Sequence, residues 1–264
     1  MICLRLFCPA VGLFVLCVLL AVPAQAASRP VVLELFTSNS CSSCPPAYAL
    51  LREFDARPPV DDVHVILLSQ HVDYWNRLGC VDRYSSADFT ARQRSYAREV
   101  FGSGRVYTPQ LVVNGRREMV ASRRSEVQAA IARAAHDLRL NVTLTARASN
   151  GAGVHLVADI AAQAQDAPAS VWFALIQDDV ASRVEAGENG GRTLVENGVV
   201  RQLHRAGRLS ADAVAKPQRF SAQLSRPHGA DMQDLSAAVF VQRDDDRRII
   251  GAAEVSLHAR AAAR

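Results

Sequence analysis

The feature that most constrains this chain is a pair of cysteines, Cys41 and Cys44, separated by two serines. The pair directly follows the apolar run Val31–Phe36 and precedes a helical pattern, so the sequence places it at a turn from a strand to a helix. The partial positive charge at a helix start favours thiolate over thiol. We therefore expect Cys41 to be an exposed, acidic nucleophile and Cys44, one helical turn later, to be the shielded resolving cysteine.

Three interpretations of this pair are open: an inert structural disulfide, half of a metal site, or a redox pair. The position at a helix start favours the redox pair. A zinc site would need four ligands, but the chain has no second CxxC motif. Copper(I) could bind to two thiolates, yet Met119 and Met232 are distant in sequence from the pair. We therefore predict no metal and no cofactor.

The N-terminus predicts export. Residues 1–26 have the features of a secretory signal peptide: Arg5 is their only charge, an apolar stretch covers Ala10–Val22, and small residues suit cleavage near Ala26. No later segment approaches about 18 continuous apolar residues, so we expect no transmembrane segment in the mature chain. The sequence predicts a periplasmic or secreted protein in which Cys80 is an unpaired bystander.

The charge pattern argues against one class of partner. The net charge is only +4, and the basic residues are scattered among acidic ones. Proteins that bind nucleic acid usually gather their lysines and arginines into a patch or a stripe. We therefore expect no nucleic-acid partner.

The order of elements in residues 28–139 points to a known arrangement. Apolar runs and helical periodicity alternate, and Asn114-Gly115 marks a hairpin that turns this part of the sheet antiparallel. Strand, helix, strand, helix, strand, hairpin, strand and helix, with the CxxC pair at the first strand-to-helix turn, is the thioredoxin arrangement. We therefore predict a thioredoxin-like α/β domain over residues 28–139, with a mixed sheet flanked by helices.

The pattern changes in residues 140–258. Short alternating segments are separated by glycine, proline and polar turns, which indicates an all-β, immunoglobulin-like sandwich domain. The tail, residues 259–264, should fray. The boundary has no flexible linker, so we expect the two domains to pack together. Gly187–Gly191 is either a loop near the cysteine pair or a plain glycine-rich turn.

Several motifs together resemble one known family, and they are spread over most of the mature chain. They are, in order, Leu33–Ser38, Cys41–Pro46, His71–Trp75, Arg92-Gln93 and Tyr107–Gln110. This set is similar to an exported bacterial thioredoxin-like family catalogued as domain of unknown function 1223. One departure is visible, because Cys80 stands where tryptophan is expected in relatives. From their place on a helix, Arg92 and Gln93 are expected on its solvated face.

The thioredoxin resemblance assigns roles to the loop before the hairpin. In proteins of that arrangement the proline before the third strand is cis and faces the CxxC pair, and the backbone of the preceding residue is offered to an extended substrate. Thr108 and Pro109 match these positions. The resemblance therefore implies a cis Thr108–Pro109 bond, with Pro109 in the catalytic site and Thr108 binding the substrate.

Other polar residues are further candidates for the site. His71, Asp73 and Trp75 follow the second strand and could line a substrate groove beside the cysteines, although aromatic side chains at such positions also pack in cores. Glu34 lies within the first apolar strand. There it could accept a proton from Cys44, or it could be a structural glutamate whose hydrogen bonds are satisfied.

The sequence thus predicts an exported thiol-disulfide oxidoreductase that acts on protein or small thiols. Its partners would be the thiols and disulfides of envelope proteins, or a redox protein that recharges the pair. The alternative is a non-catalytic binding or scaffold protein of the cell envelope with a thioredoxin shell. A copper(I)-binding protein is the third interpretation.

Overall fold

The computed structural model describes residues 28–79, 81–149, 153–163, 167–209 and 216–258. The predicted signal peptide, Cys80 and the predicted tail lie outside these residues. The helices are α1 (Pro45–Ala56), α2 (Ala87–Glu99) and α3 (Arg124–Ala134). Among the described residues, no helix is both long and apolar enough to cross a membrane. The strands are β1 (Arg29–Thr37), β2 (Val63–His71), β3 (Gln110–Val113), β4 (Arg117–Val120), β5 (Val142–Ser149), β6 (Gly153–Ile160), β7 (Ala169–Gln177), β8 (Val180–Arg183), β9 (Thr193–Glu196), β10 (Val199–Leu209), β11 (Gln218–Ser225), β12 (Leu235–Arg243) and β13 (Ile249–Ser256).

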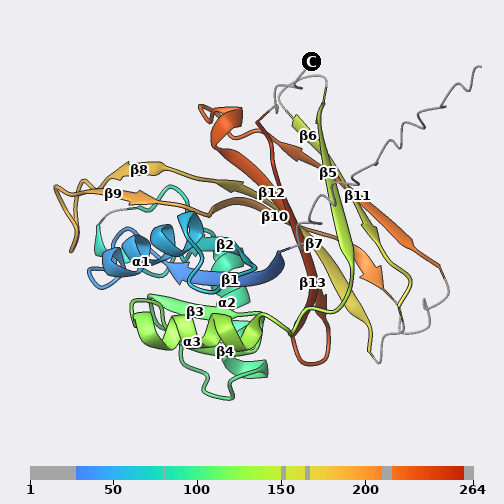
Figure 1. Cartoon of the computed structure of the whole chain (residues 1–264). Helices are drawn as coiled ribbons and strands as arrows, with labels where there is room; N and C mark the ends of the chain where they lie inside the picture. The colour runs from blue at the N-terminus through green and yellow to red at the C-terminus, as the bar shows by residue number, and fades with distance from the viewer. Residues whose placement is uncertain (1–27, 80, 150–152, 164–166, 210–215, 259–264) are drawn as a thin grey trace, which may run out of the picture.

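A mixed sheet of eight strands runs through the molecule in the order β13-β12-β7-β10-β2-β1-β3-β4 (Figure 1). β5, β6 and β11 form a three-stranded sheet, and β8 and β9 form a two-stranded ribbon that extends beside α1. β1 and β2 are parallel, whereas β3 runs antiparallel to β1 and β4 runs antiparallel to β3. Asn114 and Gly115 have the positive φ angles that the predicted hairpin requires, 45° and 70°.

The central strands β1 and β2 are buried on both faces, which explains their near-continuous apolar sequences. On one face, Leu33 and Leu35 pack under α1 and α3. On the other face, Val32 and Phe36 pack on the side of α2. Because successive strand side chains alternate, odd-numbered residues of β1 and β2 lie on the α1 face and even-numbered residues lie on the α2 face.

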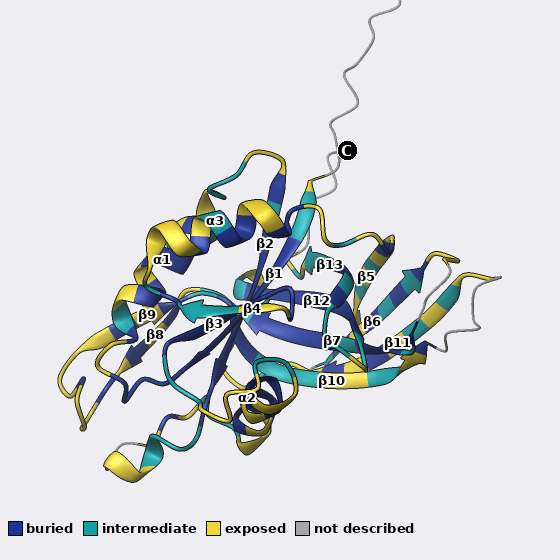
Figure 2. Ribbon diagram, turned by 90° about the horizontal axis from the view of Figure 1, so that it is seen from below, coloured by how far each residue is buried: buried dark blue, intermediate teal, exposed yellow. Residues whose placement is uncertain are grey.

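The three-stranded sheet covers the other end of the large sheet. Its Val154, Leu156 and Leu224 pack with Phe173 of β7 and Val239 of β12, on the face opposite α2. Figure 2 shows how burial is distributed: buried residues fill the middle of the large sheet, and exposed residues gather on the outer surfaces of the helices. The core is divided into clusters, and the one on the α2 face spans both halves of the large sheet, with Val32 of β1, Ile66 of β2 and Phe240 of β12.

The predicted fold class, a thioredoxin-like α/β domain followed by an immunoglobulin-like sandwich, is wrong. Strands β7, β10, β12 and β13 from the second half continue the sheet that β1 to β4 begin, instead of forming a sandwich of their own. β7 and β12 are buried along almost their whole lengths, as inner strands covered on both faces are. Alternation in a sequence indicates which segments are extended, but not which strands they pair with. The bounds 28–139 and 140–258 stay a prediction about folding units.

Gly198 allows β10, from the second half of the chain, to pair with β2 from the first half. β10 meets β2 through the pair Val199 and Ser69, and the N–H of Ser69 donates to the Gly198 oxygen at 2.6 Å. Gly198 has a φ of +71°, and a Cβ atom there would lie 2.5 Å from Leu67 Cγ. Only glycine fits both this left-handed backbone and this close approach.

Candidate functional site

The two cysteines of the CxxC motif form a disulfide, with their Cα atoms 5.5 Å apart, in the usual range for disulfides. They lie at the turn into α1, as predicted, because Cys44 is the N-cap residue of that helix. Both are buried: Cys41 is 1% exposed and Cys44 is 0% exposed. The expectation that Cys41 is exposed is therefore wrong for this oxidised state.

The start of α1 offers the sulfurs few free N–H donors. Pro45 and Pro46 occupy its first positions and have no N–H group. The N–H of Cys44 already donates to the Cys41 oxygen at 3.2 Å, and the N–H of Ala47 donates to the Cys44 oxygen at 2.9 Å. A helix start stabilises a thiolate through such donors. The stabilisation is therefore smaller here than the position at a helix start predicts.

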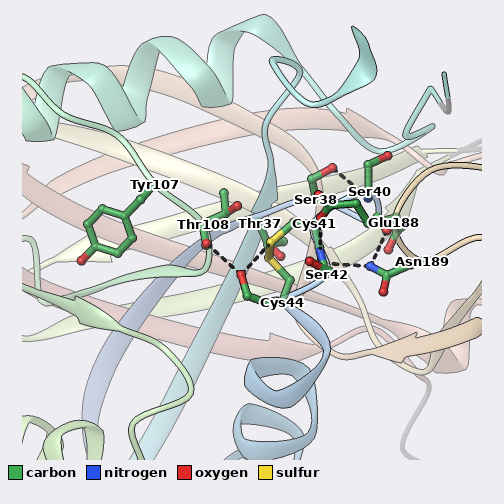
Figure 3. Close-up of a disulfide and its surroundings, with 12 residues drawn as sticks. Thr37, Ser38, Ser40, Cys41, Ser42, Cys44, Tyr107, Thr108, Glu188 and Asn189 are labelled. Atoms are coloured by element: carbon green, nitrogen blue, oxygen red, sulfur yellow. Dashed lines mark hydrogen bonds between the residues drawn. A yellow bond between two sulfur atoms is a disulfide. The ribbon is translucent and has the colours of Figure 1, made fainter. Parts of the chain in front are cut away.

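A glycine-rich loop covers the cysteines. It is the β8–β9 loop, residues 184–192, which connects the two strands of the ribbon. The fully buried side chain of Asn189 donates from Nδ2 to the backbone oxygens of Asn39 and Cys41, both at 2.9 Å (Figure 3). Of the two interpretations of Gly187–Gly191, the loop near the cysteine pair is confirmed.

Glu188 of the same loop brings a negative charge close to the disulfide. Its Oε2 accepts the N–H of Ser42 at 3.0 Å, and hydrogen bonds from Ser42 lower the pKa of this carboxyl below its usual value. A carboxylate bound to the residue after Cys41 disfavours a thiolate at Cys41. Together with the missing N–H donors, this charge should make a reduced Cys41 less acidic than the sequence predicts.

The Thr108–Pro109 peptide is cis, as predicted, and lies beside the disulfide (Figure 3). Ser43 connects the two, because its hydroxyl donates to the Thr108 oxygen at 3.3 Å and lies 3.3 Å from Cys41 Sγ. Thr108 Oγ1 is buried and has no hydrogen-bond partner among the described residues. The structure therefore brings the Thr108–Pro109 segment to the cysteine pair.

A buried charged cluster lies on the α1 face near the disulfide, and we call it the carboxylate–histidine cluster. It consists of His71, Asp82 and Glu196. Nδ1 of the fully buried His71 is 2.7 Å from Asp82 Oδ2, and Nε2 is 3.1 Å from Glu196 Oε2. Asp82 Oδ2 also accepts the N–H of Asn39 at 2.8 Å, which connects the cluster to the segment that precedes Cys41.

The two carboxylates hold the proton on His71. Burial alone would lower the pKa of the imidazole, but Glu196 and Asp82 raise it to about 10. Burial would also raise the pKa of Asp82, yet the charge of His71 keeps it below its usual value.

Tyr48 connects this cluster to the helix that begins at Cys44. It lies one turn after Cys44 on the same face of α1, and its hydroxyl is 2.7 Å from Thr37 Oγ1. Burial, and then the charge of Glu196, raise the pKa of Tyr48 far above its usual value. The phenol therefore keeps its proton next to the cysteine pair.

Glu34 lies on the opposite face of β1, under α2. Its carboxylate accepts from Arg92 Nε and from the Tyr96 hydroxyl, both at 2.5 Å, and from Gln70 Nε2 at 2.8 Å. Burial opposes its ionisation, but the charge of Arg92 holds the pKa of Glu34 below its usual value. Because α1 covers the other face of β1, the structure does not bring Glu34 to Cys44.

The remaining predicted groove residues have different surroundings. Asp73 Oδ1 accepts from Thr90 Oγ1 at 2.6 Å, so this carboxylate holds the first turn of α2. Trp75 packs against the core cluster that contains both cysteines, and its Nε1 is buried without a partner among the described residues. The structure thus packs Trp75 against the core under α1, places Asp73 at α2, and buries His71 in the carboxylate–histidine cluster.

The prediction that Arg92 and Gln93 form the solvated face of α2 is wrong. Arg92 is 8% exposed and Gln93 is 0% exposed. Arg92 faces the buried Glu34, and a carboxylate in the core needs a cation beside it. Gln93 donates to the Tyr107 oxygen at 2.8 Å, which fixes the chain just before the cis bond.

Sequence reasoning missed Asp82, Glu196 and Asn189. No local motif marks the two acids, because Glu196 is the last residue of β9, at a position that is buried like Leu194, and Asp82 lies in an irregular segment. The glycine-rich stretch around Asn189 could have predicted that this residue lies in a loop near the cysteine pair. Tyr48 had one as well, since a tyrosine one turn after the second cysteine must lie on the same helix face.

The described residues contain no group of three or more His, Cys, Asp or Glu side chains that is arranged to hold a metal ion. In the oxidised pair the sulfurs are bonded to each other and not available as thiolate ligands. Nδ1 of His71 is bonded to Asp82, and Nε2 is 3.1 Å from Glu196 Oε2 without the geometry of a hydrogen bond.

Comparison with known proteins gives a family and no activity. The family model described as "Protein of unknown function (DUF1223)" matches residues 32–242. No curated protein matches the chain. Protein AGR_C_4864 from Agrobacterium tumefaciens, a crystal structure, is 30% identical with a TM-score of 0.65, and the match covers 88% of this chain and 96% of that one.

A second solved structure is similar in fold alone. HBP35 of Porphyromonas gingivalis is 16% identical with a TM-score of 0.57, and the match covers 87% of this chain and 76% of that one. The family model, by contrast, spans more than half of the sequence. The chain therefore belongs to the family of unknown function DUF1223.

Proposed function

We propose that this chain is an exported thiol-disulfide oxidoreductase that uses Cys41 and Cys44. The observation that carries the proposal is the disulfide between two cysteines of a CxxC motif at the start of α1, with Ser43 in contact with both Cys41 Sγ and the Thr108 oxygen. The partners are thiols and disulfides of envelope proteins or small thiols, with a second redox protein to restore the pair.

A purely structural role suits this disulfide poorly. A disulfide stabilises a fold mainly by restricting the unfolded chain, and the effect grows with the size of the closed loop. With a sequence separation of 3, the expected gain is about 2 kcal/mol, against about 4.7 kcal/mol for a loop of about 100 residues. The core of this chain is large enough not to depend on such a gain.

The exchange proceeds through a mixed disulfide. A thiolate of the partner attacks Cys41 Sγ, a bond forms between the two sulfurs, and Cys44 leaves as a thiolate that takes up a proton. A second partner thiolate then attacks the partner's sulfur in the mixed disulfide, and Cys41 leaves. The partner is oxidised by two electrons and the pair is reduced by two. The reverse sequence reduces a partner disulfide, and the reduction potentials set the direction.

Tyr48 can stabilise the thiolate that Cys44 becomes. It lies one turn after Cys44 on the same face of α1, and burial and the charge of Glu196 keep its phenol protonated. A hydrogen bond from a neutral donor to a buried thiolate favours the charged form of the sulfur.

The β8–β9 loop is the gate to the disulfide. Because Cys41 is 1% exposed, a partner sulfur reaches it only when this loop moves away. The contacts that hold the loop over the cysteines are the hydrogen bonds of Asn189 and Glu188 with the backbone of the CxxC segment. Water can replace such bonds, so opening costs far less than unfolding.

One observation favours a second candidate function. Both cysteines are buried, as expected of a static disulfide that holds the β8–β9 loop in place. In that case the chain is a non-catalytic binding or scaffold protein of the cell envelope. Its disulfide would then be reduced only when the fold is lost.

Single-cysteine variants distinguish the two candidates. If Cys41 is the attacked sulfur and Cys44 the resolving one, Cys44→Ser should accumulate mixed disulfides with envelope proteins that reducing agent releases, and Cys41→Ser should accumulate few. The double variant controls for adducts made by Cys80. Equal trapping by both single variants contradicts the assignment of roles, and trapping by neither in periplasmic extract favours the binding protein.

A further inference from the structure

A pocket of about 800 Å³ lies between α2 and β10, on the side of the sheet opposite the disulfide. This volume is in the range of sites for small organic ligands. The walls come from the start of α2 and from β7, β10 and β11, which are far apart in the sequence. Part of the lining is apolar, with Phe89, Trp172, Leu203 and Leu224.

The polar part of the lining is strongly basic. Four arginines line the pocket, and Asp88 is the only acidic residue in its described lining. Two of the arginines are neutralised by carboxylates, in the pairs Arg92–Glu34 at 2.5 Å and Arg247–Glu99 at 2.8 Å. The other two, Arg83 and Arg201, form no ion pair with any described residue.

Arg83 and Arg201 both lie over the ring of Tyr84. Their guanidinium carbons lie 4.8 Å and 5.0 Å from the centre of the Tyr84 ring. Burial, and further the charge of Arg83, lower the pKa of Arg201, so the two cations repel each other. An anion bound by both guanidinium groups would remove this repulsion.

The helix start at the edge of the pocket adds little net positive charge. Ser86, the N-cap residue of α2, lines the pocket, so the positive end of a 13-residue helix lies at its edge. Asp88, in the first turn of the same helix, also lines the pocket and offsets part of this charge. Arg83 and Arg201 therefore carry the case for an anionic ligand.

We propose that this pocket binds a small soluble organic anion, a molecule with one carboxylate or phosphate group and an apolar body. Arg83 and Arg201 bind the anionic group. Phe89, Trp172 and Leu203 contact the apolar body. The site is separate from the cysteine pair, so it does not depend on the proposed redox activity.

The first test compares two dyes that differ in charge. 8-Anilinonaphthalene-1-sulfonate has a single anionic group on an aromatic body, and N-phenyl-1-naphthylamine has the same body without the charge. We expect one equivalent of the sulfonate to bind the mature chain, and the neutral dye to bind about ten-fold more weakly, because it cannot form the charge-assisted hydrogen bonds. Equal affinities for the two dyes would overturn the proposal.

The second test uses variants of the wall, with fluorescence titration as the readout. Arg83→Met and Arg201→Met should each weaken sulfonate binding about five- to ten-fold. Arg98→Met, at an exposed position of α2 outside the pocket, removes the same charge and should have an effect of less than about two-fold. Ala91→Trp should block the pocket without changing any charge. Unchanged binding in all three pocket variants would overturn the proposal.

Two further probes identify the source of the anion. Inorganic phosphate should displace the sulfonate from the original chain. Vesicles of phosphatidylglycerol should not sediment the protein more than phosphatidylcholine vesicles do. Sedimentation with the anionic vesicles that requires Arg83 and Arg201 would overturn the soluble ligand and assign the site to a lipid headgroup.

Discussion

Two buried charged clusters lie back to back on β1 and β2, and they are built differently. Under α2, Glu34 is paired with Arg92, a cation that stays charged at every pH a protein survives. Under α1, near the disulfide, His71 lies between Asp82 and Glu196. Glu34 of β1 and His71 of β2 lie on opposite faces of the sheet, because side chains alternate along each strand.

The difference separates a structural cluster from a chemical one. Arg92 also donates to Gln242 of β12 at 3.0 Å, so the Glu34 cluster connects the first strand to the C-terminal part of the sheet. The carboxylate–histidine cluster contains a histidine with a pKa of about 10, and it is connected through Asn39 to the CxxC segment. Its titration lies within the pH range of a stability measurement, whereas the arginine of the Glu34 cluster stays charged throughout that range.

The largest effect should come from breaking the Glu34 cluster. Arg92→Met leaves Glu34 and its charge buried without a cation, which should lower the free energy of unfolding by about 3–5 kcal/mol. Urea denaturation measures this loss. Arg94→Met, at an exposed position of the same helix, is the matched control and should lie within about 0.5 kcal/mol of the original chain. If Arg92→Met lowers the free energy of unfolding by less than about 1 kcal/mol, the Glu34 cluster does not have the structural role that distinguishes it from the carboxylate–histidine cluster.

The next effect is a pH dependence that belongs to the other cluster. The pKa of His71 is raised from 6.5 to about 10 in the folded protein, so its contribution to stability is complete below about pH 6.5 and is lost as the pH rises through about 10. We expect the free energy of unfolding to fall over this window in the original chain. His71→Gln should be less stable at pH 6 and should lose this slope.

His64 provides the control for that experiment. Hydrogen bonding to Glu254 raises the pKa of this histidine too, but its side chain is 45% exposed. His64→Gln should therefore keep most of the slope between pH 6.5 and 10. If His64→Gln removes the slope and His71→Gln does not, the pH dependence has been assigned to the wrong cluster.

A smaller effect concerns the gate over the disulfide. Asn189→Ala removes the two hydrogen bonds to the backbone oxygens of Asn39 and Cys41, which should cost about 1–3 kcal/mol. If the β8–β9 loop must open before exchange, dithiothreitol should reduce the Cys41–Cys44 disulfide about ten-fold faster or more in this variant. Alkylation of the freed thiols under native conditions measures the rate.

The smallest effect is expected for Glu188→Gln, which keeps an acceptor for Ser42 and removes the charge. The reduction rate at neutral pH should change less than about two-fold. The thiol of reduced Cys41 should titrate at a lower pH, because a nearby negative charge has been removed. An unchanged titration would show that Glu188 has no electrostatic influence on Cys41.

Features encoded by a few neighbouring residues could be predicted from the sequence. The strand before Cys41, the helix after it and the Asn114-Gly115 hairpin follow from local periodicity and turn chemistry. The cis bond before Pro109 followed from the resemblance and is present. The strand, the helix and the hairpin each depend on contacts within a short stretch of chain.

Long-range pairing could not be predicted in the same way. The large sheet continues into the second half of the chain because Gly198 lets β10 approach Leu67 of β2 closely. No sequence pattern within β2 or β10 predicts that contact. Likewise, His71 and Glu196 come from separate sheets. The sequence drew attention to Glu34, a carboxylate in an apolar strand, but alternation alone could not tell which face the helix with Cys44 would cover.

The central claim is that the Cys41–Cys44 disulfide exchanges with thiols while the protein stays folded. The most direct measurement is the redox equilibrium of the pair in glutathione buffers, read by alkylation, with near-ultraviolet circular dichroism recorded on the same samples. The account predicts full reduction with the spectrum of the folded protein retained, and a reduction potential above about −300 mV. Reduction that occurs only together with loss of the spectrum, or a potential below about −300 mV, would contradict it.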